Sequence, residues 1–438
     1  MAGSCPHRSV LQNRPVASAP GESAAPVLFS RIVIVALGRE TFAFTAFLGT
    51  LTALPPLSID MGLPGFPAIE AAFPDAAGRS PLTLSLFMAG FAISPLIAGP
   101  IADRFGRRAT LLDGLLIFSL AAGACALAPS FNVLLACRLL QGFAAGACAI
   151  LPIAIVRDLF VHGAARQKLS QIAAVLGIAP MLAPMLGGWI MTFADWRAIY
   201  AAQAAVGVVL LVVGAIGLAE SQPVENRRSL NPRRLAESYR FVLSDRAFVG
   251  YAMLYAFAFA CMFAFISGAP SVLIGNLGLS TTAFALLFGL TSCGVLVASL
   301  ISGQLSARHV SSRKIIAFGL VLMAASAIAA LLLVPAGAMS VAALTPLMAL
   351  TIFAFGILAP STNHEALQNL PHVAGSAAGV MRCMQMVMGA FASAMVALLE
   401  PFGHPALVMT GLMTAMALIA GSIYLWVLPA SKPGPEYS

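Results

Sequence analysis

The sequence predicts an all-α membrane protein with twelve transmembrane helices arranged in two six-helix halves. The first observation behind this prediction is composition: 60% of the 438 residues are hydrophobic and only 9% are charged, whereas a soluble domain is about 45 to 50% apolar. The second observation is length. A helix that crosses a bilayer needs about 20 apolar residues, and twelve runs of about this length follow one another along the chain. The lipid bilayer is therefore expected to surround most of the protein.

The apolar runs are bounded by Pro, Gly and charged residues, and they fall into two sets of six. The first set is expected at 41–62, 81–101, 109–129, 131–155, 168–192 and 197–219. The second set is expected at 247–275, 282–307, 314–335, 341–362, 374–398 and 405–428.

One long charged segment, residues 220–246, separates the two sets. It is expected to be a cytoplasmic linker between an N-terminal six-helix bundle, 28–219, and a C-terminal six-helix bundle, 247–428. Residues 1–27 are rich in Ser, Pro, Ala and Gly and are expected to form a disordered cytoplasmic tail. Residues 429–438 are expected to form a second cytoplasmic tail.

The distribution of positive charge predicts the orientation. Of the 24 Lys and Arg residues, Arg79 and Arg197 fall on one side of the spans, Arg138 and Arg382 fall within them, and all the others fall on the opposite side. Loops rich in Lys and Arg stay in the cytoplasm, so both termini are expected there. The predicted location is a bacterial inner membrane, which the chain crosses many times.

Composition and motifs argue against other classes of protein. The net charge of +8 fits arginines that face an anionic cytoplasmic leaflet, so no nucleic-acid partner is expected. The seven cysteines include no C-x-x-C pair and predict no disulfide or metal site. The sequence has no G-x-x-x-x-G-K-[ST], H-E-x-x-H or G-x-S-x-G motif, so neither an enzyme nor a bound cofactor is expected.

A short charged hairpin, Gly99–Arg108, joins the second and third apolar runs. The segment Gly303–Arg308 occupies the corresponding place in the second set and is a degraded copy, with Ala307 where Asp103 stands. Paired halves of this kind are the usual construction of secondary transporters, which bind substrate between the halves.

The hairpin also resembles the signature loop of the major facilitator superfamily, whose pattern is roughly G-x-x-x-D-R-x-G-R-R. The matching residues are Gly99, Asp103, Arg104, Gly106, Arg107 and Arg108. Further stretches resemble the drug:proton antiporters of that family, and within them the bicyclomycin-resistance (Bcr/CflA) branch. In the fourth expected helix, 131–155, Arg138–Gly142 matches the pattern R-x-x-Q-G. The fifth expected helix, 168–192, resembles the antiporter motif at Pro180, Ala183, Pro184, Gly187 and Gly188. The resemblance covers residues 41–428 and implies the major facilitator fold.

Asp60 and Arg138 are the candidate residues for proton coupling. Asp60 lies near the outer end of helix 1 within an apolar run, where a charged carboxylate is costly and proton uptake relieves the cost. Arg138 lies within helix 4 and is its candidate ion-pair partner. Two alternatives stay open: Asp60 caps the Leu63–Pro64 break, and Arg138 makes a static bond to carbonyls at a helix end.

Arg382 is the least expected charge, because it lies about two turns into the eleventh expected helix, 374–398. Three readings are open: an ion pair with Asp103 or Asp113, a charge in the transport cavity, or a side chain that reaches the inner surface. Gln141, Asn363 and Phe263 are further candidates for substrate binding or for contacts between the halves.

For the hairpin we predict a conformational latch. Asp103 would meet the N-terminus of the eleventh expected helix, 374–398, on the cytoplasmic side. A carboxylate at a helix N-terminus is favoured by about 0.3 to 1 kcal/mol. The alternative is that the hairpin is a solvated basic turn. The predicted function is proton-coupled export of small amphipathic compounds or drugs by alternating access, by a functional monomer with protons as the coupling ion. The alternatives are an importer of a small metabolite that works as a proton symporter, and a membrane sensor that transports nothing.

Overall fold

The computed structural model describes residues 38–222 and 232–426, and over these residues every regular element is helical. Within these residues, twelve segments are long and apolar enough to cross a membrane, and each of the twelve expected runs coincides with one of them. The long helices are α1 (Phe42–Asp60), α3 (Pro81–Phe105), α4 (Arg107–Ala126), α5 (Phe131–Leu159), α6 (His162–Ile190), α7 (Trp196–Gly217), α9 (Arg246–Pro270), α10 (Thr281–Ala307), α11 (Ser312–Leu333), α12 (Val341–Leu367), α13 (Ala374–Leu399) and α14 (Pro405–Trp426).

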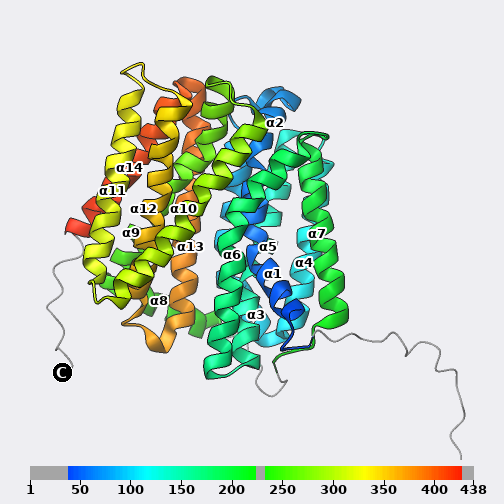
Figure 1. Ribbon diagram of the computed structural model, residues 1–438. Helices are drawn as coiled ribbons and strands as arrows, with labels where there is room; N and C mark the ends of the chain where they lie inside the picture. Colours follow the sequence, from blue (N-terminus) through cyan, green and yellow to red (C-terminus); the bar gives the residue numbers. More distant parts are fainter. Residues whose placement is uncertain (1–37, 223–231, 427–438) are drawn as a thin grey trace, which may run out of the picture. The chain divides into compact units, whose positions relative to one another are not determined.

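Two shorter α-helices in the described residues lie outside this set. The helix α2 (Phe66–Ala72) follows α1, and α8 (Pro232–Ser244) lies within the charged segment between α7 and α9. In Figure 1 they mark opposite ends of the helices, which are called below the α2 end and the α8 end. The expected tails, 1–27 and 429–438, lie outside the described residues.

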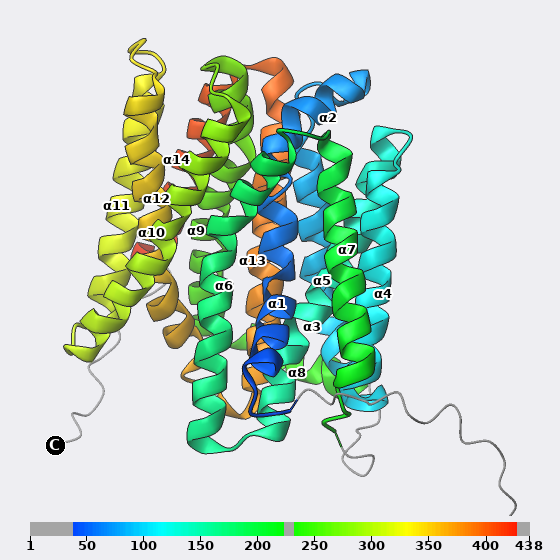
Figure 2. The same cartoon turned by 45° about the vertical axis from the view of Figure 1, so that its right-hand side comes forward.

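The long helices form two groups, α1 to α7 and α9 to α14, that meet along two seams (Figures 1 and 2). Within the first group α3 packs on α5, α4 on α7 and α1 on α6; within the second α11 packs on α12 and α9 on α14. One seam joins α3 to α13 and the other joins α6 to α10. Every candidate site described below lies on these helices or at their ends.

Glycine permits the closest helix contacts in the first group. A Cβ atom on Gly142 of α5 would lie 1.9 Å from the carbonyl oxygen of Phe87 in α3, and one on Gly90 of α3 would lie 2.0 Å from the carbonyl oxygen of Leu139. The two backbones therefore touch directly, as small residues allow in membrane helices.

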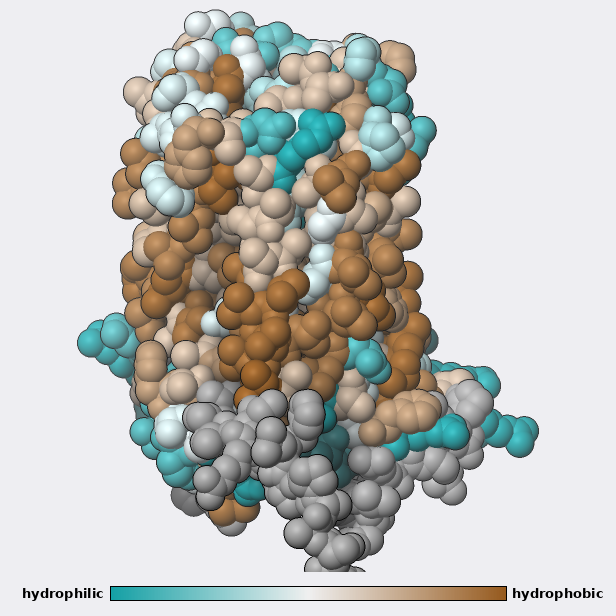
Figure 3. Space-filling view, turned by 90° about the vertical axis from the view of Figure 1, so that its right-hand side faces the viewer, coloured by the Kyte–Doolittle hydropathy of each residue, from teal (hydrophilic) through white to brown (hydrophobic). Residues whose placement is uncertain are grey.

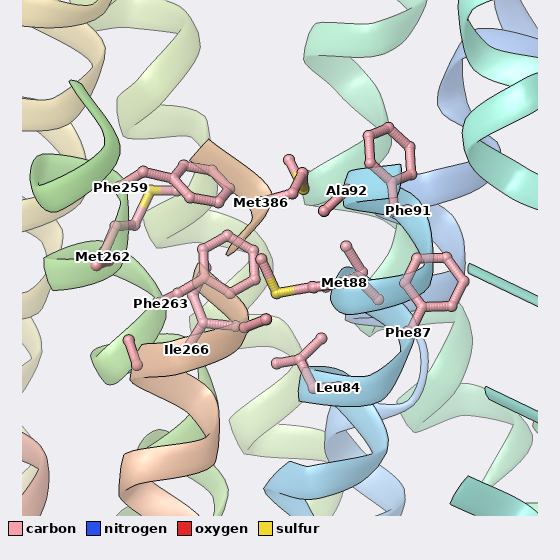
Figure 4. Close-up of a cluster of buried hydrophobic side chains, with 14 of the residues drawn as sticks. Leu84, Phe87, Met88, Phe91, Ala92, Phe259, Met262, Phe263, Ile266 and Met386 are labelled. Atoms are coloured by element: carbon pink, nitrogen blue, oxygen red, sulfur yellow. The ribbon is translucent and has the colours of Figure 1, made fainter. Parts of the chain in front are cut away.

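Apolar side chains fill the seam between α3 and the second group. Figure 4 shows Leu84 and Met88 of α3 beside Phe259 and Phe263 of α9, with Met386 of α13 next to them. All five are buried. Inside a bilayer such contacts stabilise by van der Waals packing, because lipid tails are as apolar as the side chains that they replace.

Large apolar side chains are also exposed on the outside of the helices. In Figure 3 they form a broad band across one face, and hydrophilic residues gather above and below the band. Over the described surface as a whole, exposed apolar side chains include Val209 and Val212 of α7, Leu120 of α4, and Val321 and Leu332 of α11. An exposed band of this extent is expected of a surface that faces lipid.

The seams are tightly packed toward the α2 end. On the α3–α13 seam, the hydroxyl of Ser85 donates to the carbonyl of Ala390 at 2.7 Å, and the hydroxyl of Ser393 donates to the carbonyl of Pro81 at 2.8 Å. On the α6–α10 seam, a Cβ atom on Gly188 would lie 2.4 Å from the Cβ of Ala285. The two halves are therefore in direct contact at this end.

Toward the α8 end, glycines on both sides of the seams are open. Cβ atoms built on Gly99 of α3, Gly375 of α13 or Gly303 of α10 would meet nothing within 4 Å. These glycines lie near the α8 ends of helices that take part in the two seams. The direct contacts between the halves through Ser85, Ser393 and Gly188 thus lie at the α2 end.

Candidate functional site

The charged hairpin is held by ion pairs within the first half. Nη1 of Arg107 lies 2.6 Å from Oδ1 of Asp103, and its Nε lies 3.2 Å from Oδ2 of Asp158, at the end of α5. Gly106, which separates α3 from α4, has φ 102°, a conformation that glycine adopts without strain. The sharp turn at Gly106 therefore brings Asp103 and Arg107 of consecutive helices together.

A carboxylate that the sequence did not single out caps α4. The Oε1 and Oε2 atoms of Glu220 accept hydrogen bonds from the backbone amides of Arg107 and Arg108 at 2.9 and 3.3 Å. The Arg108 side chain donates in turn to the carbonyls of Leu218 and Ala215, both at 2.7 Å. Negative charge at a helix N-terminus and positive charge at a C-terminus are both favourable, so this pair fastens α4 to α7.

The structure shows no contact of Asp103 with Arg382. Within the described residues neither Asp103 nor Asp113 forms an ion pair with Arg382, so the ion-pair reading of Arg382 is wrong for this conformation. The physical reason is that Arg107 already neutralises Asp103. Arg104 is exposed beside Phe105, as the solvated-turn alternative expects. The latch itself stays a prediction.

Arg138 is buried, with 2% of its surface exposed, and its guanidinium bonds to neutral oxygens. Nε donates to the carbonyl of Thr83 and Nη2 to the carbonyl of Ser58, both at 3.2 Å, while Nη1 donates to Oε1 of Gln141 at 2.7 Å. The ring centroid of Phe87 lies 4.3 Å from the guanidinium carbon, a cation–π distance. The charge is therefore dispersed over carbonyls, an amide and an aromatic face.

The expected ion pair between Asp60 and Arg138 is not formed. Asp60 is 5% exposed, and within the described residues its carboxylate has neither a hydrogen-bond nor an ion-pair partner. The helix α1 ends at Asp60, so its last carbonyls lack amide donors inside the helix. Arg138 takes one of them, that of Ser58, which is the alternative of a bond to helix-end carbonyls.

A polar chain runs on from Arg138 to α7. Nε2 of Gln141 donates to Oε1 of Gln203 at 2.8 Å, and both glutamines are buried. The chain joins α1, α3, α5 and α7 inside the first half. Gln203 was not a sequence candidate; its signal is a lone amide in an otherwise apolar helix. Gln141 thus belongs to this buried chain.

The candidate antiporter motif lies on α6 where that helix meets two others. A Cβ atom on Gly187 would lie 2.2 Å from the carbonyl oxygen of Met61, while Gly188 faces α10. Ala183 is fully buried beside Met61. The prolines of the motif, Pro180 and Pro184, lie inside the same helix. The motif therefore lies on the helix that packs against α10 of the other half.

A cavity of about 180 Å³ lies within the second half, between α9, α12 and α13. Its lining residues are Tyr255, Asn363, Leu367, Ala378, Met381, Arg382 and Gln385. Arg382 and Asn363, two of the sequence candidates, therefore come together here. Phe263 does not line this cavity, because it is buried in the cluster of Figure 4. Tyr255 and Gln385 were missed, since an isolated Tyr or Gln in an apolar run gives no motif.

A metal site finds no support in the part of the chain that the structure describes. No group of three or more His, Cys, Asp or Glu side chains there is close enough together to hold an ion.

Comparison with known families decides the kind of protein. Residues 41–393 match the family model described as Major Facilitator Superfamily. The chain belongs to the Major Facilitator Superfamily. It is accordingly a multi-pass membrane transporter of small molecules, and not an enzyme.

Two of the sequence relatives are named as drug-resistance proteins. The chain is 33% identical over 400 residues to the "Uncharacterized MFS-type transporter YdgK" of Bacillus subtilis, which covers 91% of this chain and 98% of that protein. It is 30% identical over 266 residues to a "Bicyclomycin resistance protein homolog" of Haemophilus influenzae, covering 61% and 67% of the two chains. It is also 30% identical over 242 residues to the "Multidrug resistance protein MdtL" of Escherichia coli, covering 55% and 61%. The resemblance to the bicyclomycin-resistance branch is confirmed at the level of sequence.

Solved structures confirm the major facilitator fold. An auto-inhibited POT family peptide transporter superposes with a TM-score of 0.70 at 13% identity, over 90% of this chain and 98% of that one. A D-xylose–proton symporter superposes with a TM-score of 0.66 at 14% identity, over 87% and 97%. Identities this low show a shared fold and nothing about the compound carried.

Proposed function

We propose that this transporter exports small amphipathic compounds in exchange for protons, working as a monomer. The observation that carries the proposal is the buried, unpartnered carboxylate of Asp60 inside a membrane span. A charged carboxylate in such a place costs several kcal/mol in free energy, so a bound proton stabilises this conformation. Opening of the surrounding helices would return the carboxylate to water and reverse that preference. Proton binding and conformation are thereby coupled.

The proposed orientation places the α8 end in the cytoplasm of a bacterium, with both termini on that side of the inner membrane. Positive residues gather at this end: Arg104, Arg107, Arg108, Arg157, Arg166, Arg240, Arg308 and Lys314 lie at or near it. Arg79 and Arg197 lie at the other end, which supports the same orientation. The α2 end, where the halves are in contact, would face outward. The conformation described here is then the inward-facing one.

In the proposed cycle, Asp60 takes a proton in the outward-facing state, the compound leaves, and the halves rock. The proton leaves on the cytoplasmic side as a new compound binds. The names of two relatives, a bicyclomycin resistance protein homolog and a multidrug resistance protein, support export of drug-like compounds. A proton symporter shares the fold, so import is the second candidate. The direction of proton movement separates the two.

The test is substrate-dependent proton movement in proteoliposomes. A panel of amphipathic compounds is added and the internal pH is followed; export predicts that compound and protons move in opposite directions, and import that they move together. We expect Asp60→Asn to abolish the pH response while the compound still binds. Asp75→Asn, at an exposed aspartate of the same end, is the matched control. An unchanged pH response in Asp60→Asn would refute the proposed coupling.

A further inference from the structure

The Arg382 cavity has a positive charge that nothing in the described chain balances. The hydrogen-bond acceptor of its guanidinium among the described residues is Oε1 of Gln385, 3.0 Å from Nη1. No described carboxylate lies within 4.0 Å of it. A desolvated cation without a counter-charge is costly inside a membrane, so the site calls for a ligand that supplies negative charge.

Arg138, the other arginine well inside the spans, gives a comparison within the same chain. Arg138 donates to three oxygens, those of Thr83, Ser58 and Gln141, and is 2% exposed. Arg382 donates to one and lines a cavity. Arg138 is therefore saturated by the protein, whereas Arg382 keeps donors available to a bound molecule.

The guanidinium of Arg382 is held in one place. Gln385, its acceptor, is itself fixed because its Nε2 donates to the hydroxyl of Tyr255 at 3.2 Å. The Tyr255 ring stacks on Phe355, with centroids 5.5 Å apart and an interplanar angle of 28°. The ring of Phe91, from α3 of the other half, lies 5.5 Å from the guanidinium carbon. A planar fork fixed in this way suits two parallel bonds to a carboxylate.

The rest of the lining is mixed. Leu367, Ala378 and Met381 are apolar, and Asn363 adds an amide whose Nδ2 is already bonded to the carbonyl of Ala359 at 2.9 Å. The volume of about 180 Å³ is below the roughly 300 to 1,000 Å³ of sites for drug-sized molecules. The cavity therefore fits the anionic head of a compound together with a short apolar part.

We propose that the exported compounds include amphipathic organic anions, and that Arg382 is the group that binds their carboxylate. This inference rests on the proposed function, because it assigns a substrate class to the same transporter. The cavity lies in the cytoplasmic half of the proposed orientation, two turns from the start of α13, which is the side from which an exporter is loaded.

The experiment compares two probes of nearly equal shape, 1-naphthoate and the neutral 1-naphthamide. Binding to the full-length protein in lipid nanodiscs is measured by equilibrium dialysis. We expect 1-naphthoate to bind about tenfold more tightly than 1-naphthamide, as one charge-assisted bidentate contact provides. Arg382→Gln should remove this preference and leave 1-naphthamide binding within about twofold, whereas Arg382→Lys should retain part of it.

Two further variants make the test independent of a folding defect. Gln385→Glu keeps the arginine and the side-chain shape but supplies an internal carboxylate next to the guanidinium, so it too should abolish the preference for 1-naphthoate. Arg308→Gln, which removes an exposed positive charge at the α8 end, is the matched control and should change nothing. Thermal unfolding of each variant reports whether it is folded.

The proposal is overturned if the wild-type protein binds the two probes equally, or if Arg382→Gln weakens both by the same factor. Proton movement driven by other compounds of the panel would then still support export, so only the assignment of the substrate class would fall. If no compound of the panel moves protons, it is the proposed function that fails, whichever probe binds.

Discussion

Three charged residues in the membrane spans, Asp60, Arg138 and Arg382, meet the cost of an apolar environment differently. Arg138 donates hydrogen bonds to two helix carbonyls and a glutamine and also contacts an aromatic ring. Arg382 donates one hydrogen bond to a described residue and lines a cavity. Asp60 has no partner in the described chain. Arginine stays charged in proteins, so the first two need polar surroundings. A carboxylate is different, because it can become neutral by binding a proton.

Arg138 is expected to contribute to stability through the geometry of its donors. Arg138→Lys keeps the charge but replaces a planar fork by a point charge that cannot reach Thr83, Ser58 and Gln141 together. We expect a loss of about 1 to 3 kcal/mol in the free energy of unfolding, the cost of leaving buried acceptors unsatisfied. Thermal unfolding in detergent measures it. Unchanged stability would show that the three bonds are replaceable.

The residues that the sequence singled out are in the structure, but their partners differ from expectation. Asp60 and Arg138 are both buried, as their place in apolar runs predicts, yet they do not pair. A sequence gives the depth of a residue along a helix and not the direction of its side chain. Gln203 and Glu220 escaped notice for the same reason, since their importance lies in atoms that come from other helices.

Among the helices, small residues decide how closely α3 and α5 approach. Their backbones touch at Gly142, where an added Cβ would lie 1.9 Å from a carbonyl oxygen of the facing helix. An oxygen of the backbone cannot move aside as the tip of a flexible side chain does. This contact places Phe87 against Arg138, so the packing of two helices also sets the surroundings of a buried charge.

Gly142→Ala is accordingly expected to destabilise the protein by about 1 to 3 kcal/mol, the usual cost of overpacking. Gly123→Ala in α4 is the matched control, because its Cβ would meet nothing within 4 Å. Alanine there should be neutral or stabilise by about 0.4 to 1 kcal/mol, since glycine is the poorer helix former. Thermal unfolding of the two variants makes the comparison, and an equal effect would contradict the close contact.

The long helices were predictable because the bilayer sets a minimum length of apolar sequence, and twelve runs meet it. The helix α8 was not predicted, because a charged, amphipathic segment such as 232–244 is as compatible with a linker as with a helix. Its place depends on tertiary contacts: the hydroxyl of Tyr239 donates to the carbonyl of Leu96 at 3.0 Å. Proline at position 100 has no amide hydrogen, so this carbonyl lacks its usual partner within α3.

At the scale of the whole molecule, the two seams determine which conformation is populated. Ser85, Ser393 and Gly188 bring the halves together at the α2 end, while glycines near the α8 end meet no neighbour. Alternating access requires these contacts to break as others form at the α8 end. A ligand or a substitution shifts this balance only by acting differently on the two conformations.

Gly188→Leu should shift the population toward opening at the α2 end. In the described conformation its side chain would collide with Ala285, because the new Cβ would lie 2.4 Å from the Cβ of that residue. We expect a cysteine placed at Ser85 to react with a membrane-impermeant maleimide about tenfold faster when Gly188→Leu is added, in a background without the native cysteines. Gly303→Leu is the control, because that position is open. Equal labelling rates would contradict the role of this seam.

The unbalanced charge of Arg382 also bears on the energy source of the transporter. With an organic anion bound opposite this arginine, each turnover sends one negative charge outward while one proton enters, so two elementary charges cross in the same electrical sense. A potential of 100 mV, negative inside, supplies about 2.3 kcal/mol for each of them. The two together correspond to a concentration ratio on the order of 10³. Membrane voltage would then drive export even where the pH on the two sides is equal.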